Sequence, residues 1–143
     1  MLTALIVEDD NLSARALSQL IRGEGFQTAT AATLAEARNR LRVQPADIVL
    51  IDLMLPDGSG LDLLDDLERD WPRTFLVVVT GHATMETAIH ALRRGAADYL
   101  TKPVDHARLT TVLTNLKRQR ELRQEVSALR SELRELGHFG AMI

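Results

Sequence analysis

The chain has 143 residues, of which 45 % are hydrophobic and 26 % charged, an ordinary balance for one soluble domain with an extension. Its net charge of −3 gives no sign of a nucleic-acid surface, and the lack of cysteine excludes disulfide bonds and thiolate metal sites. No apolar run approaches the ~20 residues that span a bilayer, and the N-terminus lacks the basic region of a signal peptide, so a cytoplasmic protein without membrane contact is expected.

Residues 2–105 alternate between short apolar runs and stretches with helical periodicity. The apolar runs, each expected to form a strand, are residues 2–7, 26–30, 47–53, 75–79 and 99–100. Leucine and alanine at helical spacing follow these runs, and Gly23, Pro72 and Gly95 mark helix ends. Five strands that alternate with five helices predict an α/β fold with a parallel sheet covered on both faces.

Helix starts are marked by polar side chains that can accept hydrogen bonds from free backbone N–H groups. Asp10 is expected to cap the first helix and Asp105 the last. Thr33 and Glu36 form a capping-box pattern at the second helix. The segment 56–58, Pro-Asp-Gly, has the composition of a turn.

Polar residues follow four of the predicted strands at the point where each strand ends. They are Glu8, Asp9 and Asp10 after the first strand, Asp52 at the end of the third, Thr80 at the end of the fourth and Lys102 after the fifth. Because binding sites of parallel α/β sheets form at the carboxyl ends of the strands, we expect these side chains to meet at one edge.

The chemistry of such a site follows from its charges. Carboxylates that share a small site repel one another and raise each other's pKa unless a cation is present. A hard cation that takes oxygen ligands and keeps several waters fits best, which predicts Mg²⁺. With the charge shielded, a carboxylate can act as a nucleophile and form an aspartyl-phosphate, with Lys102 and Thr80 contacting the phosphoryl oxygens.

Five short motifs occur together in this chain. They are Val7-Glu8-Asp9-Asp10, Ile51-Asp52-Leu53-Met54-Leu55-Pro56, Pro56-Asp57-Gly58-Ser59-Gly60-Leu61, Thr80-Gly81-His82-Ala83 and Asp98-Tyr99-Leu100-Thr101-Lys102-Pro103. Over about residues 2–120, the chain thereby resembles the receiver domain of two-component response regulators. The resemblance implies a flavodoxin-like (βα)5 doubly wound parallel sheet with strand order 2-1-3-4-5, acting as a switch domain and not as an enzyme.

The resemblance also implies roles for individual residues. Asp52 is the acceptor of a phosphoryl group from a sensor histidine kinase, with Thr80 and Lys102 as its partners in catalysis. Thr80 and Lys102 transmit the signal, and Tyr99 is the aromatic switch. The Lys102–Pro103 peptide bond is expected to be cis, a form that costs little only before proline.

The metal ligands implied by the resemblance are oxygen atoms. They belong to Asp9, Asp52, the backbone carbonyl of Met54 and, through a water molecule, Glu8. The side chains of Met54 and His82, two residues after Asp52 and Thr80, are expected to tune the lifetime of the phosphoryl group.

The last helix is expected to continue beyond the domain, because residues 105–136 contain neither glycine nor proline. Leu109, Val112 and Leu116 are expected to face the domain. After a phase shift near Gln119, a heptad seam follows, made of Leu122, Val126, Leu129, Leu133 and Leu136. This pattern predicts a coiled coil that pairs two copies as a parallel homodimer, in which Glu125 can reach Arg130 of the partner.

The predicted organisation is a receiver domain over residues 1–120, a coiled-coil linker helix over 121–136, and the start of a further linker over 137–143. Residues 80–88 resemble receivers of the nitrogen-regulator type, which activate sigma-54 RNA polymerase. Residues 137–143 resemble the lead-in to the AAA+ domain of those activators. DNA and polymerase contacts would then belong to domains absent from this chain.

Simpler interpretations remain open for single residues. Asp9 can be a helix cap, Tyr99 can be a core aromatic, and Lys102 alone can be a solvated lysine. The four histidines show no metal-ligand spacing.

Other functions remain open as well. The chain can be a receiver with another kind of output. A Mg²⁺-dependent aspartyl phosphatase would need a general acid two residues after Asp52, where Met54 stands. A flavin or nucleotide binder would need a phosphate-binding loop after the first strand, where three acidic residues repel phosphate.

Overall fold

The computed structural model describes the backbone of residues 1–140 and the side chains of residues 1–136. The side chains of the predicted linker 137–143, and all of residues 141–143, therefore lie outside the described residues. The chain divides into two compact units, Met1–Leu109 and the part that begins at Thr110.

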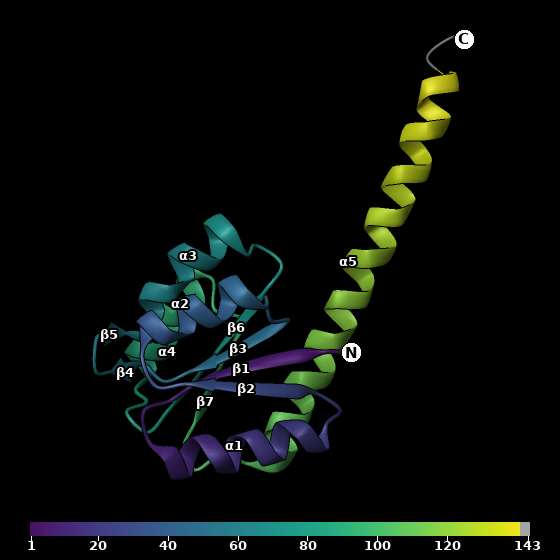
Figure 1. Cartoon of the computed structure of the whole chain (residues 1–143). Helices are drawn as coiled ribbons and strands as arrows, with labels where there is room; N and C mark the ends of the chain where they lie inside the picture. Colours follow the sequence, from purple (N-terminus) through teal and green to yellow (C-terminus); the bar gives the residue numbers. More distant parts are fainter. Residues whose placement is uncertain (141–143) are drawn as a thin grey trace. The chain divides into compact units, whose positions relative to one another are not determined.

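A parallel sheet of five strands forms the centre of the first unit (Figure 1). Its strands are β1 (Thr3–Val7), β2 (Gln27–Ala31), β3 (Ile48–Ile51), β6 (Phe75–Thr80) and β7 (Asp98–Thr101). Their order, β2-β1-β3-β6-β7, confirms the predicted order 2-1-3-4-5, because β6 and β7 are the fourth and fifth strands of this sheet.

Helices cover both faces of the sheet, as a doubly wound fold requires. α1 (Asn11–Gly23) lies on one face, while α2 (Leu34–Val43), α3 (Leu63–Asp70) and α4 (Met85–Arg94) lie on the other (Figure 1). Successive side chains of a strand point to opposite faces, so both sets of positions must be apolar here. In β1, for example, Leu5 and Val7 belong to the core cluster of α2, α3 and α4, and the alternating Ala4 and Ile6 are equally buried.

The helix starts behave largely as predicted. Asp10 Oδ1 accepts hydrogen bonds from the backbone N–H groups of Leu12 (3.0 Å) and Ser13 (3.4 Å), so Asp10 caps α1. At α2, Thr33 Oγ1 accepts from the Glu36 N–H at 3.1 Å, but the Glu36 carboxylate accepts from the Ala32 N–H. The second half of the predicted capping box is thus displaced by one residue.

A small antiparallel ribbon after β3 was not predicted. β4 (Met54–Leu55) and β5 (Gly58–Ser59) flank the turn at Pro56-Asp57, and a 3₁₀ turn (η1, Gly60–Asp62) leads into α3. Strands of two residues are too short to show a periodicity in sequence. The ribbon folds the chain back on itself, so that the N–H of Gly60 donates to the carbonyl of Leu53 at 2.9 Å before α3 begins.

α5 (His106–Gly140) is one continuous helix, as the absence of glycine and proline over 105–136 predicted. Its early apolar side chains, Leu109, Val112 and Leu116, are buried, whereas those from Leu122 onward are exposed. Pairing of this helix with a second copy stays a prediction. Within residues 1–140, no helix combines the length and apolar character needed to cross a bilayer.

Gly60 sits where no side chain fits. A Cβ atom there would lie 2.2 Å from the backbone oxygen of Asp52 and 3.0 Å from Ile51 Cγ1. We expect Gly60→Ala to lower the free energy of unfolding by about 2–3 kcal/mol, because backbone has to move. Urea denaturation followed through Trp71 measures this change.

Gly23→Ala is the matched control, because no atom lies within 4 Å of a Cβ at Gly23. Gly23 is the last residue of α1, where alanine is the better helix former, so this variant should be as stable as the natural protein or slightly more so. Equal stability of the two variants would contradict the close approach at Gly60.

Candidate functional site

Three of the predicted site residues meet at the carboxyl edge of the sheet. Glu8 directly follows β1, Asp52 follows β3, and Lys102 follows β7. Lys102 Nζ donates hydrogen bonds to Glu8 Oε2 at 2.7 Å and to Asp52 Oδ2 at 3.0 Å. One ammonium group therefore serves two carboxylates that lie 44 positions apart in the chain.

The backbone of these residues is fixed by the sheet. The N–H of Glu8 donates to the carbonyl of Ala31 at 2.9 Å, and that of Asp52 donates to the carbonyl of Val7 at 3.1 Å. The N–H of Lys102 donates to the carbonyl of Thr80 at 2.9 Å. The parallel ladder thus extends one residue beyond each strand, which sets where the site side chains start. The Lys102–Pro103 peptide bond is cis, in agreement with the prediction.

The charged groups of the site are largely withdrawn from water. Glu8 and Asp52 are each 7 % exposed, and the side chain of Lys102 is 24 % exposed. Buried charges are costly unless they are paired and hydrogen-bonded. Asp52 meets this condition, because its Oδ1 also accepts from the N–H of Met54 at 3.2 Å.

Burial and pairing shift the pKa values of the three groups. Burial raises the pKa of Asp52, but the hydrogen bonds from Lys102 and from the Met54 N–H outweigh it, so the pKa is lowered. Burial raises the pKa of Glu8 above its usual value, and the Lys102 bond offsets this only partly. Burial lowers the pKa of Lys102, but both carboxylates oppose it and the net pKa is raised. Asp52 is therefore the carboxylate that stays ionised most readily.

The other two predicted metal ligands flank the buried carboxylates in the sequence, Asp9 directly after Glu8 and Met54 two residues after Asp52. The Asp9 side chain is exposed beside Glu8, and Met54 lies in β4 with its side chain 59 % exposed. Among the side chains of residues 1–136, no group of three or more histidine, aspartate or glutamate residues is arranged to hold a metal ion. Metal binding by Glu8, Asp9, Asp52 and the Met54 carbonyl stays a prediction.

The two predicted switch residues lie on neighbouring strands. Thr80, fully buried at the end of β6, accepts a hydrogen bond on Oγ1 from the N–H of His82 at 3.1 Å. Tyr99 in β7 packs against the core cluster, as the simpler interpretation expected, but its hydroxyl is bonded to Thr87 Oγ1 at 2.7 Å. Thr87 was missed in the sequence, although its spacing from Thr84 is that of a capping pair.

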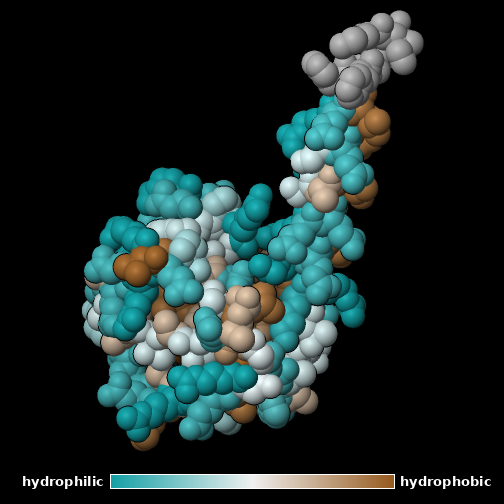
Figure 2. All heavy atoms as spheres, turned by 45° about the vertical axis from the view of Figure 1, so that its right-hand side comes forward, coloured by the Kyte–Doolittle hydropathy of each residue, from teal (hydrophilic) through white to brown (hydrophobic). Residues whose placement is uncertain are grey.

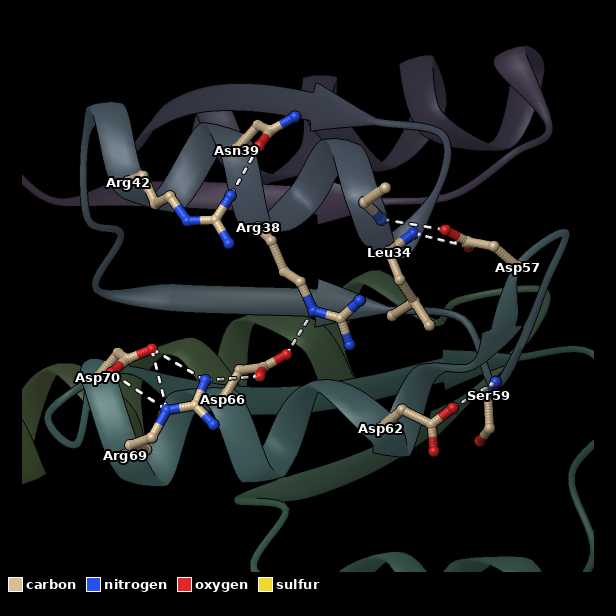
Figure 3. Close-up of polar contacts among 11 residues, drawn as sticks. Leu34, Arg38, Asn39, Arg42, Asp57, Ser59, Asp62, Asp66, Arg69 and Asp70 are labelled. Atoms are coloured by element: carbon tan, nitrogen blue, oxygen red, sulfur yellow. Dashed lines mark hydrogen bonds and ion pairs between the residues drawn. The ribbon is translucent and has the colours of Figure 1, made fainter.

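The loop after Asp52 is fastened to α2 by Asp57, which the sequence showed only as a turn residue (Figure 3). Asp57 Oδ1 accepts from the N–H of Leu34 at 2.9 Å, and Oδ2 accepts from the N–H of Ala35 at 3.0 Å. These two bonds lower the pKa of Asp57. At the other end of the ribbon, the Ser59 N–H donates to Asp62 at 3.2 Å.

An ion-pair network lies beside this attachment (Figure 3). Arg38 of α2 is paired with Asp66 of α3, and Arg69 pairs with both Asp66 and Asp70. α2 and α3 are thus joined by charged contacts on the side of the sheet that carries the loop after Asp52.

The comparison with known families decides what this arrangement belongs to. The model of the response regulator receiver domain matches residues 4–114. The chain belongs to this family. This match confirms the family predicted from the motifs, and receiver domains are switch domains.

Longer regulators are among the relatives of this receiver domain. The response regulator protein PilR of Pseudomonas aeruginosa is 39 % identical over 131 residues, which are 91 % of this chain and 29 % of PilR. The alginate biosynthesis transcriptional regulatory protein AlgB of Pseudomonas putida is 34 % identical over 131 residues, 92 % of this chain and 29 % of AlgB. The chain thus spans less than a third of these relatives.

Solved structures agree with the fold. A crystal structure of NtrX from Brucella abortus in complex with ADP has a TM-score of 0.82 and 32 % identity, covering 91 % of this chain and 29 % of that one. A receiver domain protein from Clostridium thermocellum has a TM-score of 0.78 and 26 % identity, covering 85 % of this chain and 98 % of that one.

Replacing Lys102 tests the charge balance of the receiver site. In Lys102→Met, Glu8 and Asp52 face each other without their shared cation, so we expect the free energy of unfolding at pH 7 to fall by about 1–3 kcal/mol. The pKa of Glu8, already raised, should rise further. Because the pKa of Glu8 in the folded variant then lies further above its pKa in the unfolded chain, the folded state binds the proton more tightly. The variant should therefore gain stability relative to the natural protein as pH falls from 7 towards 5.

Urea titrations at both pH values measure the difference between variant and natural protein. Arg15→Met, which removes an exposed cation from α1, is the control and should show no such pH dependence. A difference for Lys102→Met that is the same at both pH values would show that the carboxylates do not depend on this lysine.

Proposed function

We propose that Asp52 accepts a phosphoryl group from a sensor histidine kinase in a Mg²⁺-dependent reaction, and that this change switches the domain. The observation that carries the proposal is the contact of Lys102 with both Asp52 and Glu8 at the carboxyl edge of a receiver sheet. A buried carboxylate that stays ionised, next to a cation that can move with an incoming anion, suits phosphoryl transfer.

Asp52, Lys102 and Thr80 each have a separate role in the proposed phosphoryl transfer. An ionised Asp52 oxygen forms the new bond to phosphorus, while the bond between phosphorus and the donor breaks and its electrons leave with the donor group. Lys102 Nζ, 3.0 Å from Asp52 Oδ2, is close enough to follow the phosphoryl oxygens as charge shifts onto them. Thr80 can donate its hydroxyl to the same oxygens. Met54 has no proton to give, so an aspartyl phosphatase gains no support.

Mg²⁺ fits the donor set of this edge. The candidate ligands are the carboxylates of Glu8, Asp9 and Asp52 and the carbonyl of Met54, all oxygen atoms of the kind that hard divalent cations prefer. The buried acidic pair already gathers one cation, the Lys102 ammonium, and exposed Asp9 opens the site towards solvent. When bound, the ion would neutralise charge on the carboxylates and the incoming phosphoryl group.

Intact mass measurement after incubation with acetyl phosphate tests the proposal. We expect the natural protein to gain one phosphoryl group with Mg²⁺ and none with a chelator, and Asp52→Asn to gain none. Asp9→Asn should lose most of the gain. Asp10→Asn is its matched control, because asparagine caps a helix as well as aspartate and Asp10 is assigned to the cap of α1.

Two results would count against the proposal. A mass gain that survives in Asp52→Asn would place the acceptor elsewhere, and absence of any gain in the natural protein would remove the phosphoacceptor function.

We further propose that two copies pair through α5. Its exposed stripe, Leu122, Val126, Leu129, Leu133 and Leu136, is 43–65 % exposed along a single helix face (Figure 2). Apolar residues at alternating gaps of four and three are the pattern of a coiled-coil seam, and a valine at one seam position with leucine at the next favours two helices. Since two heptads alone are marginal, contacts elsewhere in the dimer are expected to contribute.

A change in the dimer on phosphorylation would control the output of a sigma-54-type transcription activator, whose further domains are absent from this chain. This would take place in the cytoplasm. The similarity to PilR extends over 131 residues, whereas that to the photosynthetic apparatus regulatory protein RegA of Rhodovulum sulfidophilum, at 38 % identity, extends over 109. The longer match favours the output class of the PilR-like regulators over that of the RegA-like ones.

Sedimentation of the natural chain should show a concentration-dependent dimer. Leu129→Asp, which places a charge in the seam, should give monomers, with at least a tenfold weaker association. Ser127→Asp adds the same charge off the seam and should leave the dimer intact. Equal association of both variants would mean that this stripe is not the contact between copies.

A further inference from the structure

Asp57 joins the loop after Asp52 to the first turn of α2 (Figure 3). Its two carboxylate oxygens accept one hydrogen bond each, from the N–H of Leu34 at 2.9 Å and from the N–H of Ala35 at 3.0 Å. Leu34 and Ala35 are the first two residues of α2, and N–H groups at that place have no partner within their own helix. Since the helix dipole also favours negative charge there, the contact suits an ionised side chain at position 57.

α2 has a cap of its own without Asp57. Thr33 Oγ1 accepts from the N–H of Glu36 at 3.1 Å, and the carbonyl of Thr33 accepts from the N–H of Ala37 at 3.0 Å. These are the bonds that an N-cap residue normally makes. The bonds of Asp57 are additional to them, and they attach a segment that lies 22 and 23 positions away in the chain.

The attached segment is too small to be stable alone. β4 and β5 have two residues each, and their pairing sets Met54 opposite Ser59. A two-stranded hairpin is at best marginally stable by itself. This one packs on α2, because a Cβ atom at Gly58 would lie 3.0 Å from Cδ1 of the buried Leu34. The Asp57 bonds and this contact together hold the tip of the ribbon on α2.

The other end of the ribbon contacts Asp52. The N–H of Met54, the first residue of β4, donates to Asp52 Oδ1 at 3.2 Å. Met54 also carries the backbone carbonyl that is predicted to bind the metal ion. Only two residues separate Met54 from Asp57, and one of them, Pro56, has a fixed φ. A shift of the ribbon tip is therefore passed on to the backbone of Met54.

We propose that Asp57 is a positioning residue for the predicted Mg²⁺ site, because it holds the β4–β5 ribbon against α2 and thereby fixes the backbone of Met54 beside Asp52. The proposal rests on the function proposed above for Asp52 and on the predicted ligand role of the Met54 carbonyl. Without the Asp57 bonds the ribbon adopts more conformations, and only a fraction of them place this carbonyl for the ion. The apparent affinity for Mg²⁺ falls by that fraction.

Titration of ¹⁵N-labelled protein with MgCl₂, followed through the backbone N–H resonances of Asp52 and Met54, measures Mg²⁺ affinity without any reaction. We expect Asp57→Ala to bind Mg²⁺ about tenfold more weakly than the natural protein, as is typical when a residue that supports a metal ligand is lost. Asp57→Asn can keep one of the two bonds through its amide oxygen, so its affinity should fall by about threefold. The same spectra show whether each variant is folded.

Thr33→Ala is the matched control, because it removes the other side-chain acceptor at the start of α2 and leaves the ribbon attached. It should bind Mg²⁺ with the affinity of the natural protein. Phosphorylation by acetyl phosphate, read by intact mass, gives a second readout. Asp57→Ala should need about tenfold more Mg²⁺ for half of the mass gain, but should reach the gain of the natural protein at saturating Mg²⁺.

Equal Mg²⁺ affinity of Asp57→Ala and the natural protein would overturn the inference, and so would an equal loss of affinity in Thr33→Ala and Asp57→Ala. The proposed function of Asp52 would stand in both cases. If MgCl₂ moves neither resonance of the natural protein, the predicted metal site fails, and the proposed Mg²⁺-dependent function fails with it.

Discussion

The ammonium group of Lys102 holds together two buried carboxylates that would otherwise repel each other. Glu8 and Asp52 end neighbouring strands, whereas Lys102 follows β7, and β6 lies between β7 and β3. The lysine side chain therefore crosses one intervening strand, over about 10 Å between strand axes. Thr80, a small residue at the end of β6, suits that crossing, and a long flexible side chain with a compact charge is the kind that can make it. The order of the strands therefore decides whether the Lys102 ammonium can reach the carboxylates of Glu8 and Asp52 and balance their charge.

The fold could be predicted from the sequence because each layer leaves its own pattern. Strands buried on both faces are continuous apolar runs, and the helices between them show one apolar side. The edge position of Glu8, Asp52, Thr80 and Lys102 followed from the rule that parallel strands end together. These predictions needed only local patterns and one topological rule. The strand order was implied only by the resemblance to receiver domains, and the observed order agrees with it.

What the sequence did not reveal are contacts between polar residues far apart in the chain. Asp57 was correctly seen as a turn residue, but its partners lie 22 and 23 positions away at the start of α2. Thr87 and Tyr99 are separated by 12 positions, and neither residue type predicts a contact with the other. Such pairings are set by how helices seat on the sheet, which a single sequence does not specify.

The occupied start of α2 has a consequence for which anions the domain attracts. A helix start normally draws phosphate, because its free N–H groups and the helix dipole favour negative charge. Here Asp57 already fills that place on α2, Asp10 does so on α1, and hydroxyls of Thr84 and Thr87 close α4. A small anion that reaches this edge of the sheet thus meets helix starts whose N–H groups already have partners. Lys102, whose Nζ lies 3.0 Å from Asp52 Oδ2, remains there to attract it, so the occupied helix starts favour the approach of an anion towards Asp52.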